Sequence, residues 1–441
     1  MRDDLNPSRR AFLKAAALAA APAIIPATAL GRGRTSPSDR IALGMIGLGS
    51  MGLRHVKGFV QEDDCQIIRL CDVDAARRSG AAGEVKRAYD GAEATQLNNF
   101  EDVLADPDVD AVVIAVPDHW HAALGVAACR AGKDVYGEKP LALTVRGGRA
   151  MVEAVRRCNV VWQMGSWQRS TVQFRRAAEL VRNGRLGKLQ RVEVGLAEGF
   201  RPQGRPMAYH LARQPAMPVP KGFDYDRWLG PAPWRPYTKD RCHWNFRWIL
   251  DYSGGQVTDD GAHQIDIAHW GMGADRTGPV EVEGTGEFPT DGIWDAAYRF
   301  RFRCLYASGV VMHVASSNYM RGGITFIGDR GRVHVQRGGY IGAEPASLLR
   351  EPIGPGEIHL ASPTEGHRQG HRRNFLDCVR SRQEPITPIE VGHHSIIPAH
   401  LGNIAMLLGR KLRWDPERET FPDDPEARRM LWKPQREPWQ F

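Results

Sequence analysis

Residues 41–52 read IALGMIGLGSMG, a short apolar strand pattern that runs directly into a G-x-G-x-x-G turn and the expected start of a helix. In this frame Gly47 permits the tight turn, Gly49 lets backbone N–H groups approach a phosphate, and Gly52 lets the helix pack closely against the strand. The N-terminus of that helix then favours bound phosphate. The stretch therefore predicts a dinucleotide-binding unit whose contacts come from Gly47, Gly49, Ser50, Met51 and Gly52.

The sequence has a carboxylate at the position where a dinucleotide-binding unit usually carries one. The second apolar strand, CQIIRLC at residues 65–71, ends at Asp72, about 20 residues beyond Gly52, from where an acidic side chain reaches a ribose 2′-hydroxyl. Its negative charge would repel a 2′-phosphate, which favours NAD, although Arg77 and Arg78 lie close enough in sequence to leave NADP open. The plain structural alternative is a glycine-rich turn followed by a helix-capping aspartate.

The chain downstream continues to alternate between strand and helix patterns. Helices are expected near residues 75–89 and 119–131, and strands at 111–116 and 134–137. Alternation of this kind predicts a parallel, doubly wound α/β sheet. The strand at 134–137 delivers Glu138-Lys139-Pro140 at its carboxyl end, the edge of such sheets where ligands bind. Reactive groups are therefore expected there.

The composition is that of an ordinary globular protein. The chain has 441 residues, 25% charged and 42% hydrophobic, with 47 Gly and 29 Pro; it is long enough for two domains and is not disordered, collagen-like or coiled-coil. The net charge of +8 is scattered rather than gathered into a basic stripe, so nucleic-acid binding is not expected. Seven Cys in a chain of this length do not form a disulfide framework.

The N-terminus has the features of an export signal. Residues 8–14, SRRAFLK, precede an apolar run at 15–30 that contains an Ala-x-Ala cleavage pattern, and the segment is similar to a twin-arginine signal. Because Pro22 and Pro26 interrupt the run, it falls below the roughly 18 apolar residues of a membrane span. We therefore expect a signal peptide at 1–30, a flexible leader at 31–39, and a periplasmic or secreted protein exported folded by the twin-arginine machinery. An uncleaved N-terminal anchor is the alternative.

Three further motifs reduce the number of protein families that the sequence could belong to. They are VPDHWH at 116–121, EKP at 138–140 and GGQVTDDGAHQID at 254–266. Together with the glycine motif, they make the chain from about Arg40 to its end resemble the Gfo/Idh/MocA oxidoreductase family, which includes glucose-fructose oxidoreductase and inositol dehydrogenase. The resemblance implies a Rossmann domain at 40–165 and a C-terminal α/β domain at 166–441. That second domain would carry a large, mainly antiparallel open sheet, with a strand-rich region at 298–337, and would assemble a homodimer or homotetramer. It also implies that residues 392–394 precede a helix.

The resemblance and the chemistry of hydride transfer point to the same catalytic groups. Oxidation of a secondary alcohol leaves a hydroxyl proton that a nearby base must remove, and Lys139, beside a positively charged nicotinamide, is the candidate. Asp259 and His263 stand four positions apart, which places them on one face of a helix. The resemblance puts both in the substrate pocket: His263 would relay the proton, and Asp259 would bind a hydroxyl or fix the tautomer of His263. A capping aspartate and a buried core histidine are the structural alternative.

Other residues are expected around these groups. The resemblance places Val116, Pro117, His119, His121 and Glu138 beside the nicotinamide end of the cofactor, with Lys139. No metal is predicted, because the two imidazoles of His119 and His121 have no third ligand at a recognisable spacing. Aromatic and basic side chains that suit a sugar suggest further substrate contacts, although core packing or a subunit interface would explain them as well: Trp167, Arg169, Trp244, Arg247 and Tyr252.

These features predict an NAD(P)-dependent oxidoreductase that transfers hydride between a nicotinamide and a secondary hydroxyl or keto group of a sugar or polyol. Because free dinucleotide is scarce outside the cytoplasm, the export signal predicts that the cofactor stays tightly bound. Two alternatives remain open. The same site would suit an NAD-dependent glycosidase or lyase that oxidises a ring hydroxyl transiently. A non-catalytic sugar- or dinucleotide-binding protein would also keep the scaffold, but the presence of Lys139, Asp259 and His263 argues against it.

Overall fold

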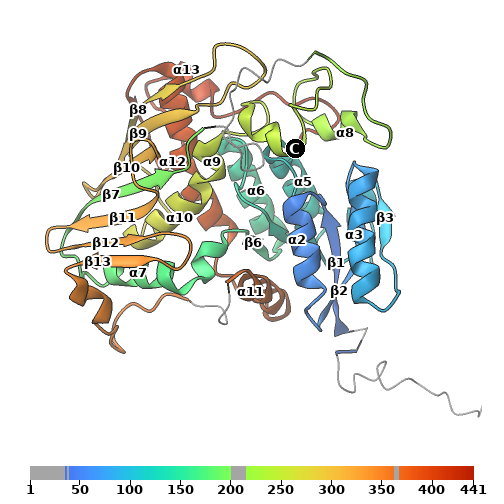
Figure 1. Ribbon diagram of the computed structural model, residues 1–441, viewed down its shortest axis with the longest axis horizontal. Coiled ribbons are helices and arrows are strands. Elements are labelled where there is room, and N and C mark those ends of the chain that lie inside the picture. The colour runs from blue at the N-terminus through green and yellow to red at the C-terminus, as the bar shows by residue number, and fades with distance from the viewer. Residues whose placement is uncertain (1–34, 37–38, 200–214, 362–366) are drawn as a thin grey trace, which may run out of the picture. The chain divides into compact units, whose positions relative to one another are not determined.

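The first six strands form one parallel sheet (Figure 1). The computed structural model describes residues 35–36, 39–199, 215–361 and 367–441. The strands are β1 (Ile41–Ile46), β2 (Cys65–Cys71), β3 (Thr95–Leu97), β4 (Ala111–Ile114), β5 (Asp134–Gly137) and β6 (Trp162–Met164). Their order, β3-β2-β1-β4-β5-β6, reverses direction between β1 and β4, so a ligand crevice lies beyond the carboxyl ends of these two strands. The predicted doubly wound sheet is confirmed.

Helices cover both faces of this sheet, because its strands bury apolar side chains on both sides. They are α2 (Ser50–Phe59), α3 (Ala75–Ala88), α4 (Phe100–Leu104), α5 (Asp118–Arg130) and α6 (Val145–Cys158). The side chains of Asp74 and Thr144 cap α3 and α6 by accepting hydrogen bonds from backbone N–H groups. The strand expected at 111–116 ends at Ile114, and Pro117 becomes the N-cap of α5.

The second half of the chain builds an eight-stranded sheet. Its strands are β7 (Leu189–Leu196), β8 (Glu281–Glu287), β9 (Arg299–Leu305), β10 (Val311–Ser316), β11 (Gly323–Gly328), β12 (Arg332–Val335), β13 (Ile341–Glu344) and β14 (Leu412–Arg413). The order is β13-β12-β11-β7-β10-β9-β8-β14, and only the β7–β10 pair is parallel. In β9, Phe300 and Phe302 are buried while Arg299 and Arg301 face outward, as one-sided burial requires. The expected large, mainly antiparallel sheet is confirmed.

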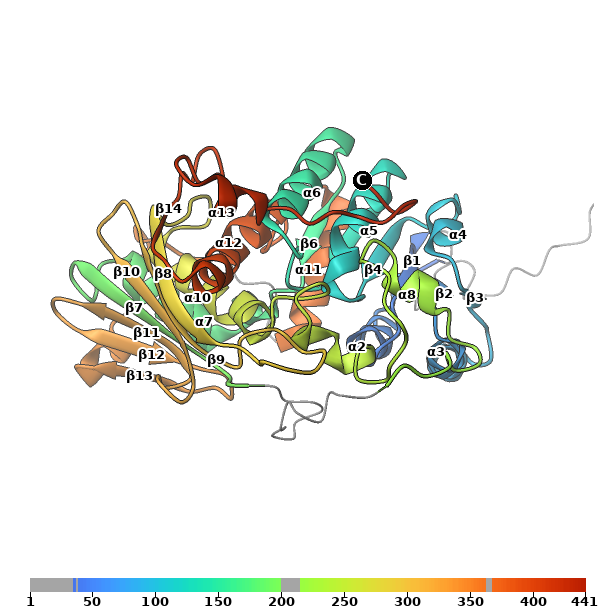
Figure 2. The ribbon, with the colours of Figure 1, turned by 90° about the horizontal axis from the view of Figure 1, so that it is seen from above.

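Helices separate the two sheets, and the two views agree on their place (Figures 1 and 2). The helix α12 (Ile389–Leu408) contacts α6 on one side and α10 (Gly261–Met272) and β8 on the other. Residues 392–394 were expected to precede a helix, but they lie inside α12, because burial on all sides stabilises the helix despite its glycine. The remaining helices are α7 (Val172–Arg182), α9 (Gln256–Asp259), α11 (His367–Ser381) and α13 (Pro425–Arg429), with short 3₁₀ turns η2 (Trp167–Ser170) and η6 (Ala346–Arg350).

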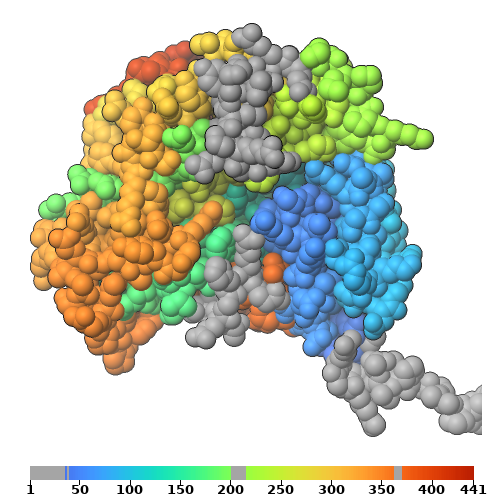
Figure 3. Space-filling view, viewed as in Figure 1, coloured from blue at the N-terminus to red at the C-terminus, as the bar shows by residue number. Residues whose placement is uncertain are grey.

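One segment of the second half lies along the first sheet. Residues 223–248, which we call the strap, contain α8 (Tyr225–Leu229) and the 3₁₀ helix η5 (His243–Trp248). The strap forms its own apolar cluster and pairs with the first domain through a β-bridge between Asp74 and Phe223. In Figure 3 this green segment lies against the blue N-terminal part of the first domain. The strap therefore borders the edge where the ligand crevice opens.

The predicted signal peptide at 1–30, and the leader residues 31–34 and 37–38, lie outside the described residues. In the part of the chain that is described, no helix is long and apolar enough to cross a membrane. Residues Ile41–Phe441 form one compact unit, so both sheets belong to the same body.

Candidate active site

The glycine turn has the geometry that the sequence predicts. Gly47 adopts a φ of +86°, and a Cβ there would lie 2.5 Å from the Ala115 carbonyl oxygen. A Cβ at Gly52 would lie 1.9 Å from the Gly47 carbonyl oxygen, so only glycine allows α2 to pack on the turn. The N-cap of α2, Gly49, contributes no side-chain cap, which leaves the N–H groups of the first turn to a ligand. These features fit a dinucleotide phosphate.

Asp72 is fixed beside this turn. Its Oδ2 accepts a hydrogen bond of 2.7 Å from Leu48 N, and its Oδ1 accepts one of 2.9 Å from Asp74 N. Burial raises the pKa of the Asp72 carboxyl, and the positive charge of Arg77 opposes that shift only in part. The side chain is therefore held rigidly at the place where the ribose of a dinucleotide would lie.

A single cavity of about 620 Å³ extends from the glycine turn to the end of β5. The residues predicted for the site that line it are Gly47, Gly49, Ser50, Met51, Asp72, Val116, Pro117, Glu138, Lys139, Trp244, Arg247 and Asp259. Its lining also includes residues of the strap, so the strap and the first domain enclose the space together. The cavity joins a phosphate-binding turn to a group of charged side chains.

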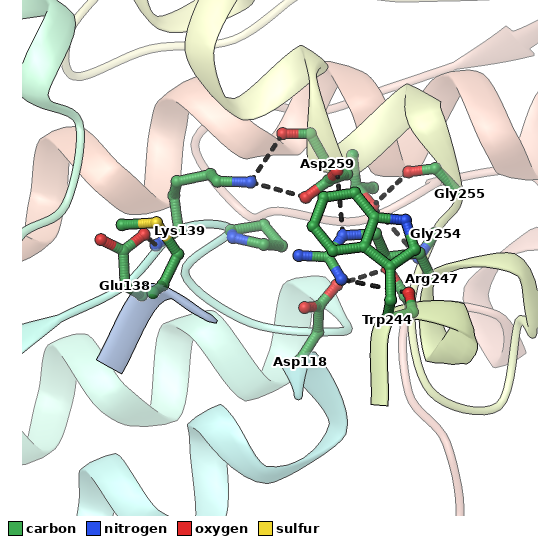
Figure 4. Close-up of polar contacts among 12 residues, drawn as sticks. Asp118, Glu138, Lys139, Trp244, Arg247, Gly254, Gly255 and Asp259 are labelled. Atoms are coloured by element: carbon green, nitrogen blue, oxygen red, sulfur yellow. Dashed lines mark hydrogen bonds and ion pairs between the residues drawn. The ribbon is translucent and has the colours of Figure 1, made fainter. Parts of the chain in front are cut away.

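Lys139 and Asp259 face each other at the far end of the cavity (Figure 4). The Lys139 Nζ donates to Asp259 Oδ1 at 2.6 Å and to the Asp259 carbonyl oxygen at 2.9 Å. Both side chains are mostly buried, with 12% of Lys139 and 21% of Asp259 exposed. The peptide bond between Lys139 and Pro140 is cis. An amine thus lies beside a carboxylate at the predicted strand end.

Asp259 also binds a second cation. Arg247 donates through Nε to Asp259 Oδ2 at 3.1 Å, and its guanidinium lies 4.3 Å from the ring centroid of Trp244 and 4.7 Å from that of Phe246. Burial opposes ionisation of the Asp259 carboxyl, but Lys139 and Arg247 outweigh it and hold its pKa below the ordinary value. The carboxylate is therefore ionised, and two donors and an aromatic face stand beside it.

Glu138, which directly follows β5, stabilises the backbone at Lys139. Its Oε1 accepts a hydrogen bond of 2.8 Å from His55 Nε2, and its Oε2 accepts one from the Lys139 backbone N–H at 3.2 Å. Burial disfavours the carboxylate, but the hydrogen bond and charge of His55 together with Lys139 outweigh burial and lower the pKa of Glu138. Glu138 is thus a buried carboxylate in the cavity wall that fixes the backbone of Lys139.

The two histidines after β4 do not line the cavity. His119 Nε2 lies 3.0 Å from the Trp228 carbonyl oxygen, and burial lowers its pKa to about 4. His121 has its ring nitrogens 2.6 Å from the Pro140 carbonyl oxygen and 2.9 Å from that of Val116. Both imidazoles therefore contact backbone segments around the site, and the fold does not bring them into the cavity lining with the other predicted cofactor residues.

Arg169 and Tyr252, two predicted substrate contacts, are buried away from the cavity. Arg169, 2% exposed, binds Asp266 through Nε and Nη2 and Asp275 through Nη2, because a buried guanidinium needs carboxylate partners. Tyr252 is fully buried in the apolar cluster of the strap, where its hydroxyl accepts from Arg241 Nη1 at 3.2 Å. Neither side chain reaches the cavity. Arg169 instead holds η2 against α10.

His263 and Trp167 contact each other outside the cavity lining, with ring centroids 6.1 Å apart. Trp167 also has Arg337 over its ring, at 5.4 Å. The expected helix face shared by Asp259 and His263 is divided, because α9 ends at Asp259 and α10 begins at Gly261. Lys139 donates to one oxygen of the Asp259 carboxylate and Arg247 donates to the other.

Sequence reasoning missed several residues of the cavity wall. Asp118 lines it and accepts a hydrogen bond of 2.5 Å from Ser253 Oγ; its position directly after Val116-Pro117 at a strand end could have signalled it. Asn98, Phe100 and Arg227 also line the cavity; they come from distant parts of the chain that only tertiary contacts bring together, so no local pattern marks them.

Comparison with known protein families shows which family the chain belongs to. Residues 41–166 match the oxidoreductase family NAD-binding Rossmann fold, and residues 170–441 match the C-terminal alpha/beta domain of the same family, GFO_IDH_MocA. The chain belongs to the Gfo/Idh/MocA oxidoreductase family. The oxidoreductase class and the NAD cofactor expected from the sequence are thereby confirmed at the level of the family.

Individual members of the Gfo/Idh/MocA family are similar to this chain. The scyllo-inositol 2-dehydrogenase (NAD(+)) of Bacillus subtilis is 26% identical over 79% of this chain and 88% of that protein. A glycosyl hydrolase family 109 protein of Stenotrophomonas maltophilia is 29% identical over 44% of this chain and 43% of that protein. For several curated relatives, the matched part is less than half of their own length.

Solved structures share the fold. The aldose-aldose oxidoreductase of Caulobacter crescentus, complexed with glycerol, superimposes with a TM-score of 0.61 at 19% identity, over 85% of this chain and 99% of that one.

Proposed function

We propose that the protein is an NAD(P)-dependent oxidoreductase that transfers hydride between a tightly bound nicotinamide cofactor and a secondary hydroxyl or keto group of a sugar or polyol. The observation that carries this proposal is the single cavity that joins the glycine turn and Asp72 to Lys139, Asp259 and Arg247. Similarity to an inositol dehydrogenase over 79% of the chain supports the substrate class. When bound, the nicotinamide supplies the hydride acceptor.

Lys139, just after β5, and the side chains close to it have separate roles in the reaction. Lys139 takes the hydroxyl proton of the substrate, and Asp259 holds the Lys139 amine in place for that transfer. Arg247 donates to substrate oxygens, while the ring of Trp244 offers a face for the C–H side of a sugar. We assign no proton step to His263, because it does not line the cavity.

Two measurements test this function. Mass spectrometry of the small molecules released from freshly purified, denatured protein is expected to find NAD or NADP. Adding sugars and polyols to the native protein is then expected to raise the absorbance of the reduced nicotinamide with at least one compound. A dinucleotide that no sugar or polyol reduces, with or without added NAD, would contradict the proposed reaction.

A second function, glycoside cleavage by transient oxidation, is favoured by the similarity to a glycosyl hydrolase family 109 protein. Oxidation of a ring hydroxyl acidifies the neighbouring C–H, which permits elimination of the glycosidic substituent before the hydride returns. Aryl glycosides separate the two functions. Release of the aryl alcohol without net cofactor reduction supports cleavage. Oxidation of the sugar with formation of an equal amount of reduced cofactor supports the dehydrogenase.

The proposed place of action is the periplasm or the cell exterior. The support is the SRRAFLK motif at residues 8–14, followed by an apolar run. Replacing Arg9 and Arg10 by Lys is expected to keep the protein in the cytoplasm, which fractionation of a producing bacterium would show. Equal export of the variant and the wild type would contradict the twin-arginine route.

The proposed assembly is a homodimer or homotetramer formed through the outer face of the eight-stranded sheet. Charged side chains of β8 and β9, including Glu283, Arg301 and Arg303, line a groove of about 580 Å³ on that face. Light scattering after size-exclusion chromatography would give the oligomer mass. A monomer at all concentrations would contradict this assembly.

A further inference from the structure

The strap is tied to the first domain at several points around the cavity. Asp224 accepts a hydrogen bond of 3.0 Å from Asn98 Nδ2, and Arg227 binds Glu101 at 2.9 Å. The Trp228 carbonyl oxygen accepts from Trp120 Nε1 at 3.1 Å. Because these contacts join the loop after β3 and the first turns of α4 and α5 to the second half of the chain, the strap closes one wall of the cavity.

Arg77 lies beside the glycine turn. Its Nη1 lies 2.8 Å from where a Cβ of Gly49 would stand, so the guanidinium covers the turn that fits a phosphate. A contact with Asp74, at 3.5 Å, holds its Nε. A cation at this distance from a phosphate-binding turn is suited to phosphate oxygens.

His243 of the strap holds Arg77 in this place. Arg77 Nη2 donates to His243 Nδ1 at 2.5 Å, and the imidazole lies against the ring of Phe223, with centroids 5.3 Å apart. Burial first, and then the charge of Arg77, lowers the pKa of His243 to about 4, so the ring is neutral. Because a guanidinium can only donate, Nδ1 is the ring nitrogen that accepts. The backbone of His243 has a φ of +55°, an uncommon conformation that the folded strap imposes.

We infer that the strap retains the dinucleotide, and that Arg77, positioned by His243, is the cation that faces its phosphate oxygens. This inference rests on the proposed function, because it assumes that a dinucleotide occupies the cavity. Bound dinucleotide would leave only when the strap separates from the first domain, and breaking the contact between Arg77 and His243 favours that separation. His243 is a positioning residue, since it acts through Arg77.

Exchange of the cofactor tests this inference directly. Purified protein with its dinucleotide is mixed with excess isotope-labelled NAD, and mass spectrometry follows the replacement. His243→Ala is expected to exchange at least about tenfold faster than the wild type, the change that corresponds to losing one hydrogen bond to a charged group. His243→Asn is expected to exchange near the wild-type rate, because its side-chain oxygen accepts from Arg77 and asparagine tolerates a positive φ.

A reversible lock provides a second test within one variant. Asp74 and Phe223 are paired across an antiparallel bridge, a spacing that suits a disulfide. The variant with Asp74→Cys and Phe223→Cys is expected to exchange its dinucleotide about tenfold more slowly when oxidised than after reduction. Equal rates in the two redox states, together with an unchanged rate in His243→Ala, would overturn the inference. A protein that purifies empty but oxidises sugars with added NAD would overturn both the inference and the tight binding of the cofactor, while leaving the proposed hydride transfer standing.

Discussion

Lys139 is fixed twice, by the end of β5 and by its two hydrogen bonds to Asp259. Replacing it tests the proton transfer, because Lys139→Ala removes the amine and leaves the glycine turn and Asp72 intact. We expect the variant to retain its dinucleotide and to lose turnover by about 10² or more. Dinucleotide content by mass spectrometry and sugar-dependent cofactor reduction measure the two effects. A variant that turns over as fast as the wild type would remove Lys139 from its assigned role.

The carboxylate of Asp259 lies between two cations, Lys139 and Arg247. Asp259→Asn keeps the shape of the side chain but leaves Lys139 and Arg247 without the anion between them, so we expect kcat/KM to fall by about 10². The adjacent Asp260 is a matched control, because its Oδ2 accepts from Ala197 N and it does not line the cavity. Asp260→Asn is expected to stay within about threefold of the wild type. Equal losses in both variants would mean that the effect is structural.

Several of the predicted residues that the fold brings to the cavity lie at strand ends. Asp72 directly follows β2 and Lys139 is the second residue after β5, and a parallel sheet gathers such positions at one edge. Arg169 and Tyr252 were not placed correctly, because a residue type that suits sugars also suits a buried ion pair or an apolar cluster. Only the fold shows that Asp266 and Asp275 take the guanidinium of Arg169.

At the scale of the element, the position of α2 depends on one glycine. A Cβ at Gly52 would lie 1.9 Å from a backbone oxygen that cannot move aside, so Gly52→Ala must push α2 away from the turn. We expect a loss of unfolding free energy of about 2 kcal/mol or more and weaker dinucleotide retention. Urea unfolding and dinucleotide content of the purified variant measure these effects.

The control for that change lies in the next helix. Gly83 is inside α3, and a Cβ there would meet nothing within 4 Å. Gly83→Ala is expected to stabilise the protein by about 0.5–1 kcal/mol, because alanine restricts the unfolded chain and favours the helix. If Gly52→Ala proved as stable as Gly83→Ala, then close packing of α2 on the turn would not be what requires glycine at 52.

For the whole molecule, the sequence predicted the first sheet better than the second. The strands β1, β2, β4 and β5 alternate with helices in chain order, so local periodicity was enough to place them, whereas the three-residue strand β3 was not predicted. In the second sheet β7 pairs with β10 and β11, partners far away in sequence, and their pairing depends on contacts that no local pattern records. The helix α12 illustrates the same limit, since its burial between both sheets makes residues 392–394 helical.

Buried histidines make the stability of the whole molecule depend on pH. Burial lowers the pKa of His119, His371 and His400 to about 4, from an ordinary value of 6.5. As the pH falls below 6.5, the unfolded chain therefore binds protons before the folded one does, and the free energy of unfolding decreases between pH 6.5 and 4. Each such histidine contributes at most about 1.4 kcal/mol per pH unit.

His400 offers a clean test of this dependence, because its Nε2 donates to the Ala142 carbonyl oxygen at 3.1 Å. A glutamine amide can make the same donation but does not titrate. We expect His400→Gln to lose less unfolding free energy than the wild type between pH 6.5 and 4.5, as urea unfolding at a series of pH values would show. Parallel pH profiles for the two proteins would mean that His400 is protonated equally in the folded and unfolded chains, and that acid lability arises from other groups.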